Sequence, residues 1–413
     1  MAEASGTVAL PGMDVRRLER NLYEVYIGPA HPGSGHMRIV VRVEGDVMVE
    51  VDPDIGFVHR TMEKLSEGRD WMKNIPLLER MAILDACNVT LPYVEAVEKL
   101  LDVDPPERAK YLRTLLCEIN RVASHLYGFG IFGVFLGHST LYMWAFGDRE
   151  IFVELADRLT GARLTHSYPM FGGVRRDMPD DFGQNVRRAA AYMRRRLDEY
   201  ADIFLRNPNI RSRLAGVGVI SGARAVEMGL SGPNVRASGV RYDARLAEPY
   251  EAYDRVDFEV PVYEEGDSLA RAWQRVDEIR QSLSIMEQAV DWLERHPREG
   301  FIHEKFWKTA PPIYKQVYAG AVPYAGKYRV KMIPLYASLR VPAGRSFARV
   351  ESGRGEIIYY VESDGKDTPY RVRVVSGSFR NVIAFKYAMP GHRLADLPAI
   401  YGSFDYFPPE WDR

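Results

Sequence analysis

The sequence predicts an α+β fold, with a central bundle of about four long helices, an N-terminal antiparallel β hairpin or sheet, and a C-terminal strand-and-loop region. Apolar residues recur at helical spacing through the middle of the chain, and β-branched runs flank a turn near its start. Past Pro297, short aromatic and β-branched runs alternate with glycine and proline. We expect an N-terminal β region with a His-Gly loop at 1–65, a helical core at 66–300, and a region closing the site at 301–413.

The predicted hairpin covers residues 38–51, RIVVRVEGDVMVEV, where two β-branched runs flank Glu44-Gly45-Asp46. Apolar residues then recur at helical spacing on both sides of Pro105-Pro106, and Pro106 is well placed to start a helix. These patterns predict two long antiparallel helices at about 75–103 and 106–135.

A third helix is predicted at about 181–206, and its arginines are expected on a solvated or partner-facing surface. A fourth begins at Asp267-Ser268 and repeats apolar residues such as Trp273 and Leu283 at the spacing of a bundle helix. In the C-terminal part, GEIIYYVES and YRVRVV read as strands. The arginines of the third helix are Arg187, Arg188, Arg194, Arg195 and Arg196.

Charge and cysteine content exclude several classes of protein. The chain has 413 residues, with 55 Lys and Arg against 56 Asp and Glu, so no overall field favours nucleic acid. Its two cysteines, Cys87 and Cys117, exclude a disulfide scaffold and a cysteine-ligated cluster within this chain, and we expect both to be buried. Without a long apolar run or an export signal, we expect a peripheral protein on the cytoplasmic face of the membrane.

Residues 28–38, GPAHPGSGHMR, hold His31 and His36 around a pliable glycine-containing link. Such a loop could ligate a metal, bind a phosphate or hold a redox-active small molecule. No His-x-x-x-His or His-Glu-x-x-His pair lies on a predicted helix, which disfavours a zinc hydrolase. GVGVISG at 216–222 lacks the spacing of a dinucleotide loop and is predicted to be a structural turn, and His125 a core histidine.

His59 and Arg60 stand where a strand ends and a short helix begins. An arginine cannot lose its proton, so Arg60 near a redox centre would favour the more negative, reduced form of that centre. The alternative is an ordinary ion pair with Glu63 or another carboxylate at the helix end. The residues alone leave both possibilities open.

Further segments follow in a characteristic order. They are GPAHPGSGHMR at 28–38, DPDIGFVHRTMEKL at 52–65, VEAVEKLL at 94–101, PPERAKYLR at 105–113, GGVRRDMP at 172–179, VRASGVRYD at 235–243, EPYEAYDRVDFEVPV at 248–262, ARVESGRGEIIYYVESDG at 348–365 and the closing SFDYFPPEWDR. From about residue 25 to its last residue, the chain resembles the 49-kDa-type (D-type) subunit of respiratory complex I, an NADH-quinone oxidoreductase. That family is related to the large subunit of nickel–iron hydrogenases.

The hydrogenase relatives bind nickel and iron through an early Arg-x-Cys-x-x-Cys and a late Asp-Pro-Cys-x-x-Cys. Here the early stretch is ERMAIL at 79–84, and Phe407 and Glu410 stand where the late thiolates would be. A nickel–iron centre needs soft thiolate ligands. The resemblance therefore implies no metal and no cofactor bound by this chain, and a cavity available to another ligand.

In the complex I family that cavity receives a quinone as substrate, held by the second loop histidine and by a tyrosine of an Arg-x-x-Tyr step. The resemblance implies catalytic roles for His36 and His31, with His138 as a further proton source. Ile83 stands where the tyrosine is expected, and Phe135 where an aspartate usually backs the histidine. The implied quinone-binding residues are Gly35, His36, Met37, Ile83, Phe135, His138, Thr140 and Phe407, and the implied cluster-facing residues are Arg60 and His166.

We therefore expect a peripheral-arm subunit of a complex I-like oxidoreductase and translocase that uses NADH or another donor. With a partner carrying a 4Fe-4S cluster, it would form the quinone-reduction pocket, and it would have no activity alone. One alternative is the large subunit of a membrane-bound hydrogenase-like or sulfane-reductase-like complex with a non-quinone acceptor. Another is a structural scaffold with a decayed site. The expected partners are B-like (cluster-bearing), C-like, I-like and membrane H-like subunits, and no nucleic acid.

Overall fold

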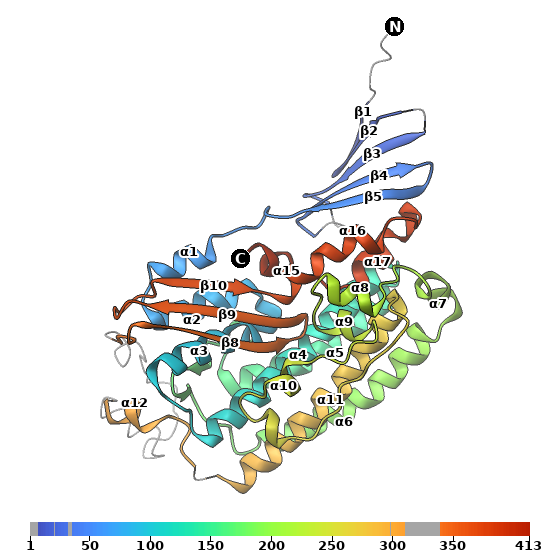
Figure 1. Cartoon of the computed structure of the whole chain (residues 1–413). Coiled ribbons are helices and arrows are strands. Elements are labelled where there is room, and N and C mark those ends of the chain that lie inside the picture. Colours follow the sequence, from blue (N-terminus) through green and yellow to red (C-terminus); the bar gives the residue numbers. More distant parts are fainter. Residues whose placement is uncertain (1–6, 20, 32–34, 298, 310–338) are drawn as a thin grey trace.

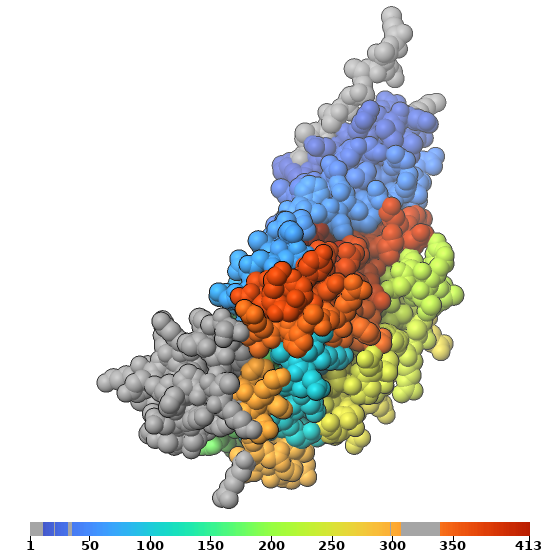
Figure 2. Space-filling model, turned by 60° about the vertical axis from the view of Figure 1, so that its left-hand side comes forward, coloured from blue at the N-terminus to red at the C-terminus, as the bar shows by residue number. Residues whose placement is uncertain are grey.

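The computed structural model describes residues 7–19, 21–31, 35–297, 299–309 and 339–413. A five-stranded sheet, a bundle of long helices and a three-stranded sheet with short helices make up these residues (Figure 1), which confirms the α+β class. Figure 2 shows the orange and red C-terminal segment between the blue N-terminal segment and the teal and yellow segments from the middle of the chain. No helix of the described residues is both long and apolar enough to cross a bilayer.

The N-terminal sheet is antiparallel throughout, with its strands in sequence order. The strands are β1 (Thr7–Leu10), β2 (Met13–Arg17), β3 (Leu22–Ile27), β4 (Arg38–Glu44) and β5 (Val47–Asp54). The predicted hairpin is confirmed as β4 and β5, and Gly45 in its turn has φ +66°, which glycine adopts without strain. Through β5 the sheet contacts α16 (Phe385–Ala388), so it rests on the C-terminal part of the chain.

Four long helices form the bundle, namely α4 (Glu107–Phe135), α5 (Ser139–Thr160), α6 (Phe182–Tyr200) and α11 (Ser268–Arg295). Helices α4 and α6 each contact both α5 and α11. As predicted, α4 follows Pro106, and α11 follows Asp267, whose side chain accepts a hydrogen bond from the Ala270 backbone N–H (2.7 Å). Helix α5 is not among the predicted helices.

Three of the five arginines of α6 pair with neighbouring helices, whereas Arg188 and Arg195 are exposed, so the expectation of a solvated or partner-facing surface is corrected in part. Arg187 binds Asp291 (2.6 Å) and Arg194 binds Glu287 (2.6 Å), both on α11. Arg196 binds Asp148 of α5 (2.8 Å). These pairs join the third predicted helix to its neighbours in the bundle.

The helix predicted at 75–103 is interrupted, and only α3 (Ala86–Leu101) is continuous. Ala82 has extended backbone angles, with φ −142° and ψ 84°. The Glu79 carboxylate is fully buried and accepts a hydrogen bond from Ser167 Oγ (3.0 Å), a tertiary contact that stands at the interruption. Helix α3 packs mainly on β8 and β9, and it also contacts α4 of the bundle. The interrupted stretch comprises α2 (Asn74–Leu78) and 3-10 turns at Glu79–Met81 and Ile83–Asp85.

The C-terminal strands form an antiparallel sheet of order β10-β9-β8. They are β8 (Gly344–Ser352), β9 (Gly355–Ser363) and β10 (Arg371–Val375), and β9 and β10 confirm the strands predicted in GEIIYYVES and YRVRVV. Four short helices follow that the sequence does not predict, and they lead the chain back toward the bundle and the N-terminal sheet (Figure 1). They are α15 (Gly377–Asn381), α16, α17 (Leu397–Ser403) and α18 (Pro408–Asp412).

Predictions for the core are largely confirmed. Cys87 and Cys117 are fully buried, with their sulfurs 3.2 Å apart and not bonded as a disulfide. His125 is also fully buried, its Nε2 lies 3.2 Å from Glu278 Oε2, and burial lowers its pKa. The predicted turn is found at the start of 216–222, where Gly216 and Gly218 have positive φ, and the rest of this stretch leads into α8. The remaining short elements are α1 (Met62–Glu67), β6 (Pro169–Met170), β7 (Gly173–Val174), α7 (Pro208–Leu214), α8 (Gly222–Glu227), α9 (Pro233–Arg236), α10 (Ala244–Ala247), α12 (Glu304–Thr309), a π-helical turn at Ala201–Leu205, and 3-10 turns at Trp71–Lys73, Tyr253–Arg255, Val382–Ala384 and Leu394–Asp396.

Candidate functional site

The histidine turn of the GPAHPGSGHMR loop lies against two tyrosines from the C-terminal end. Gly35 and His36 both have left-handed backbones, with φ +55° and +72°, and His36 is exposed. A Cβ at Gly35 would lie 2.8 Å from the Tyr406 ring and 3.2 Å from the Tyr401 hydroxyl, so only glycine fits there. Residues 32–34, the centre of the predicted pliable link, lie outside the described residues.

The two tyrosines belong to an aromatic cluster that includes the end of α4. The ring centroids of Tyr401 and Tyr406 are 3.8 Å apart, and Phe135 lies 5.6 Å from Tyr401. Burial raises the pKa of both phenols, so each holds its proton at neutral pH. Met37 is fully buried in the adjoining core. Gly35, Met37 and Phe135, all implied by the family resemblance, thus meet in one region.

An arginine from the turn between β8 and β9 contacts the closing segment SFDYFPPEWDR. Arg354 donates to Ser124 Oγ of α4 (2.8 Å) and to Asp405 (3.2 Å). Its guanidinium carbon lies 5.4 Å from the centre of the Phe407 ring. Glu410 is buried, accepts a hydrogen bond from the Ser378 backbone N–H (3.1 Å), and has its pKa raised by burial.

These surroundings do not fit a nickel–iron centre. An aromatic ring and a carboxyl group occupy the positions of the late thiolates, and the two cysteines of the chain lie in the core between α3 and α4. Across the described part of the chain, no group of three or more His, Cys, Asp or Glu side chains is placed to hold a metal ion. The site therefore lacks the soft donors that such a metal pair requires.

Ile83 and His166 line a very small cavity of about 10 Å³. His166 is buried, and this burial lowers its pKa to about 4, so the ring is neutral at pH 7. Its Nδ1 lies 3.0 Å from the Ala162 carbonyl oxygen, which requires Nδ1 to carry the hydrogen, and Nε2 then accepts from Asn120 (3.0 Å). Asp85, two residues after Ile83, accepts from the Gly353 backbone N–H (2.7 Å) and ties this stretch to the turn carrying Arg354.

Arg60 is exposed and donates to the carbonyl oxygen of Arg80 (2.5 Å), at the start of the early stretch. The suggested ion pair with Glu63 is wrong, because Glu63 binds Arg371 (3.3 Å). Arg60 is therefore attached to the 3-10 turn that precedes the one carrying Ile83.

The other predicted residues have local contacts. His138 caps α5, since its Nδ1 accepts from the Leu141 backbone N–H (3.1 Å), and Thr140 is exposed in the first turn of that helix. His31 lies beside the turn between β1 and β2, where a Cβ at Gly12 would be 3.1 Å from the His31 Cβ.

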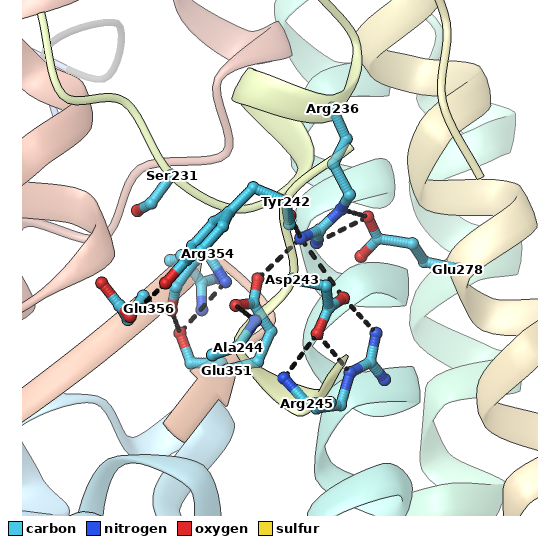
Figure 3. Close-up of polar contacts among 12 residues, drawn as sticks. Ser231, Arg236, Tyr242, Asp243, Ala244, Arg245, Glu278, Glu351, Arg354 and Glu356 are labelled. Carbon is cyan, nitrogen blue, oxygen red and sulfur yellow. Dashed lines mark hydrogen bonds and ion pairs between the residues drawn. The ribbon is translucent and has the colours of Figure 1, made fainter. Parts of the chain in front are cut away.

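Behind the site, a buried charge network centred on Arg236 joins α9, α11 and β8 (Figure 3). Arg236 donates to Glu278 (2.8 Å) and Glu351 (2.8 Å), and lies 3.3 Å from Asp243. Asp243 in turn binds Arg245 (2.7 Å). All five side chains are buried, and the network fixes the elements on which Arg354 and the α4 end rest.

Sequence reasoning missed Tyr401, Tyr406 and Arg354. Two signals were present: Tyr406 lies within the closing SFDYFPPEWDR, and Arg354 within the ESGRGE turn. Their proximity to Gly35 and Phe407 arises only when distant segments of the chain meet.

The helical bundle, the C-terminal sheet and the closing segment beside the Gly35 turn are those of a subunit of a larger oxidoreductase. The chain belongs to the family described as "Respiratory-chain NADH dehydrogenase, 49 Kd subunit", whose profile matches residues 136–413. It is thus a subunit of complex I-type respiratory oxidoreductases, which are multi-subunit and membrane-associated.

Relatives of this chain have different named activities. The chain is 38% identical over 380 residues to the D-type subunit of the NADH-quinone oxidoreductase of Geobacillus thermodenitrificans, covering 92% of this chain and 95% of that one. It is 36% identical over 397 residues to the D-type subunit of the F420H2 dehydrogenase of Methanosarcina mazei, covering 96% and 99%. A chain of an archaeal membrane-bound sulfane sulfur reductase superposes with a TM-score of 0.83, at 36% identity and with coverage of 96% and 100%.

Proposed function

We propose that this chain forms, with a subunit carrying a 4Fe-4S cluster, the pocket in which electrons pass from that cluster to a quinone or similar acceptor. The observation that carries the proposal is the contact of the Gly35-His36 turn with Tyr401 and Tyr406, beside Phe407 at a former thiolate position. Family membership supports the same role. C-like, I-like and membrane H-like subunits would complete the assembly on the cytoplasmic face of the membrane.

Reduction of a quinone to a quinol takes two electrons, which the partner's cluster supplies, and two protons, which this chain must deliver. Ile83 and Phe135 have no proton to give. His36 is exposed on the turn, and the two phenols hold their protons at neutral pH, so these groups are the donors we assign. Gly35 lets the turn backbone approach a flat ring closely.

The second candidate is an acceptor other than quinone. Phe135 makes the acceptor region more apolar than the family pattern, and relatives include a sulfane sulfur reductase and an F420H2 dehydrogenase. Turnover of the purified complex with a quinone and with a polysulfide separates the two candidates. A scaffold with a decayed site predicts turnover with neither.

The direct test is His36→Ala in the assembled complex. Loss of a general acid should lower acceptor reduction by a factor of roughly ten to a thousand, while donor-driven reduction of the cluster continues. His303→Ala, near α12, is the matched control and should retain normal turnover. Normal turnover in the His36→Ala complex would remove His36 from the proposed site.

A further inference from the structure

A larger cavity, of about 390 Å³, lies away from the acceptor site. Its walls come from the second half of α3, the link from α3 to α4, the loop at 248–255 and β8. None of the residues assigned to the acceptor pocket lines it.

One side of this cavity holds more negative than positive charge. Glu95, Glu98 and Glu251 line it, and the buried Arg113 binds only two of them, Glu98 (2.6 Å) and Oε1 of Glu251 (2.8 Å). Gly172 N–H also donates to Glu98 (2.7 Å).

Two acceptors remain unused. The Glu251 side chain is only 3% exposed, yet its Oε2 has no hydrogen-bond partner. Glu95 makes no hydrogen bond or ion pair with any of the residues that the structure describes. An unpaired buried carboxylate oxygen is costly, so its retention points to a missing partner. Glu251 also has a left-handed backbone, with φ +51°, of the kind that persists where the surroundings enforce it.

The basic side chains around the cavity do not supply that partner. Lys99 donates to the Phe347 carbonyl oxygen (3.0 Å), and Lys110 binds Asp104 (2.7 Å). The two arginines on the other side of the cavity also pair with carboxylates. Arg349 binds Glu248 (2.6 Å), and Arg255 binds Asp254 (3.3 Å) and Glu107.

We propose that this cavity binds a primary ammonium group, with the Glu95 carboxylate and Oε2 of Glu251 as its acceptors. A metal ion is disfavoured, because the described residues place no set of three or more metal-binding side chains together. A guanidinium prefers a bidentate carboxylate, but Arg113 already takes one oxygen of Glu251. An ammonium has three rotatable donors and suits separate single oxygens.

The ammonium group can come from a free polyamine or from a lysine of a neighbouring subunit. Without it, burial and the nearby Glu251 and Glu98 carboxylates raise the pKa of Glu95 well above its ordinary value. The raised pKa favours the protonated form of Glu95, and binding of the cation should favour loss of that proton. This inference does not depend on the identity of the electron acceptor.

The test measures spermidine binding to the purified complex by calorimetry in two buffers of different ionisation enthalpy. Wild type should bind with release of up to about one proton, and Glu95→Gln should weaken binding by about tenfold or more, because one charge-assisted hydrogen bond is lost. Glu95 has no partner among the described residues, so this variant should fold normally. Glu259→Gln, exposed and outside the cavity, is the control and should bind as wild type does.

The source of the cation is distinguished by carbodiimide coupling, which joins a carboxylate to an amine held against it. If a neighbouring subunit fills the cavity, spermidine will not bind, and mass spectrometry should find Glu95 coupled to a lysine of that subunit. Spermidine binding that is equal in wild type and Glu95→Gln overturns the proposal. So does the absence of both spermidine binding and lysine coupling in wild type.

Discussion

At the scale of single residues, Arg60 offers the sharpest test of how this chain influences its electron donor. Its exposed guanidinium is attached to the early stretch through the Arg80 carbonyl, and its charge is permanent. If it faces the partner's cluster, Arg60→Met should lower the midpoint potential of that cluster by about tens of millivolts, on a scale of about 59 mV per tenfold change in equilibrium constant. A redox titration of the cluster's EPR signal in the assembled complex measures this shift.

Arg60→Lys serves as the control for charge. It keeps the positive charge but loses the fork of donors, so its midpoint should fall between those of wild type and Arg60→Met. A midpoint in Arg60→Met equal to that of wild type would leave Arg60 only its contact with Arg80, and no place near the electron path.

Glu79 should make the stability of the chain depend on pH. Burial raises its pKa from 4.5 to about 7. The unfolded chain loses this proton at lower pH than the folded chain, so the contribution to stability is fully present below pH 4.5 and is lost as pH rises toward 7. Glu79→Gln keeps an acceptor and a donor for Ser167 without a charge. Relative to wild type, this variant should gain about 3 kcal/mol in the free energy of unfolding between pH 4 and pH 8.

Urea unfolding of wild type and Glu79→Gln across that range gives the comparison, because other titrating groups cancel in the difference. A difference that does not change with pH would show that Glu79 ionises normally in the folded chain. Asp181→Asn, at an exposed position of the surface, should show no such trend.

Much of the candidate site could be named from the sequence, but its contacts could not. The histidine loop and the replaced thiolates Phe407 and Glu410 are visible as motifs. The partners of that loop, Tyr401 and Tyr406, lie more than 360 positions along the chain from Gly35, beyond the reach of any local pattern. The family resemblance places His166 toward the cluster, and only the structure shows this ring neutral and bonded on both nitrogens.

At the scale of elements, the buried network at Arg236 holds α9, α11 and β8 together (Figure 3). Arg236→Met would leave Glu278 and Glu351 without their shared cation in the core. Removing one partner of a buried ion pair costs about 3–5 kcal/mol, so we expect a loss of that size in the free energy of unfolding. Urea unfolding of the purified chain measures it.

Arg345→Met is the matched control, because Arg345 binds Glu362 (3.1 Å) on the surface with its side chain 70% exposed. That variant should unfold close to wild type, since exposed pairs contribute little. Equal stability of Arg236→Met and wild type would mean that the buried carboxylates take up protons at little cost.

Pattern reasoning succeeds for elements with one apolar face and fails for the others. Helices α4 and α11 begin where caps and apolar spacing place them. Helix α5 is not predicted because Met143 and Trp144, on its outer side, are 66% and 37% exposed. Its two faces therefore differ little in hydrophobicity. The helices after β10 have only four to seven residues, too few for a helical period to be recognised.

At the scale of the whole molecule, the two ends of the chain close the same region. The N-terminal sheet contacts α16 through β5, and the Gly35 turn rests on tyrosines from α17 and the segment before α18. The acceptor region is therefore assembled only when the last residues have folded back onto the first sixty. Relatives with different named activities match this chain over nearly their full length.

The Asp412 side chain also links these two ends. Its carboxylate accepts from the backbone N–H groups of Gly56 (2.7 Å) and Val58 (2.9 Å), in the loop that leads to Arg60. Asp412→Ala removes two charge-assisted hydrogen bonds, each worth about 1.5–3 kcal/mol, and should speed amide hydrogen exchange at Gly56 and Val58 by roughly tenfold to a hundredfold. Asp198→Ala, in an exposed pair with Arg280, should leave their exchange unchanged. If both amides stay as protected in Asp412→Ala as in wild type, then other contacts close this loop and the chain end is not what positions Arg60.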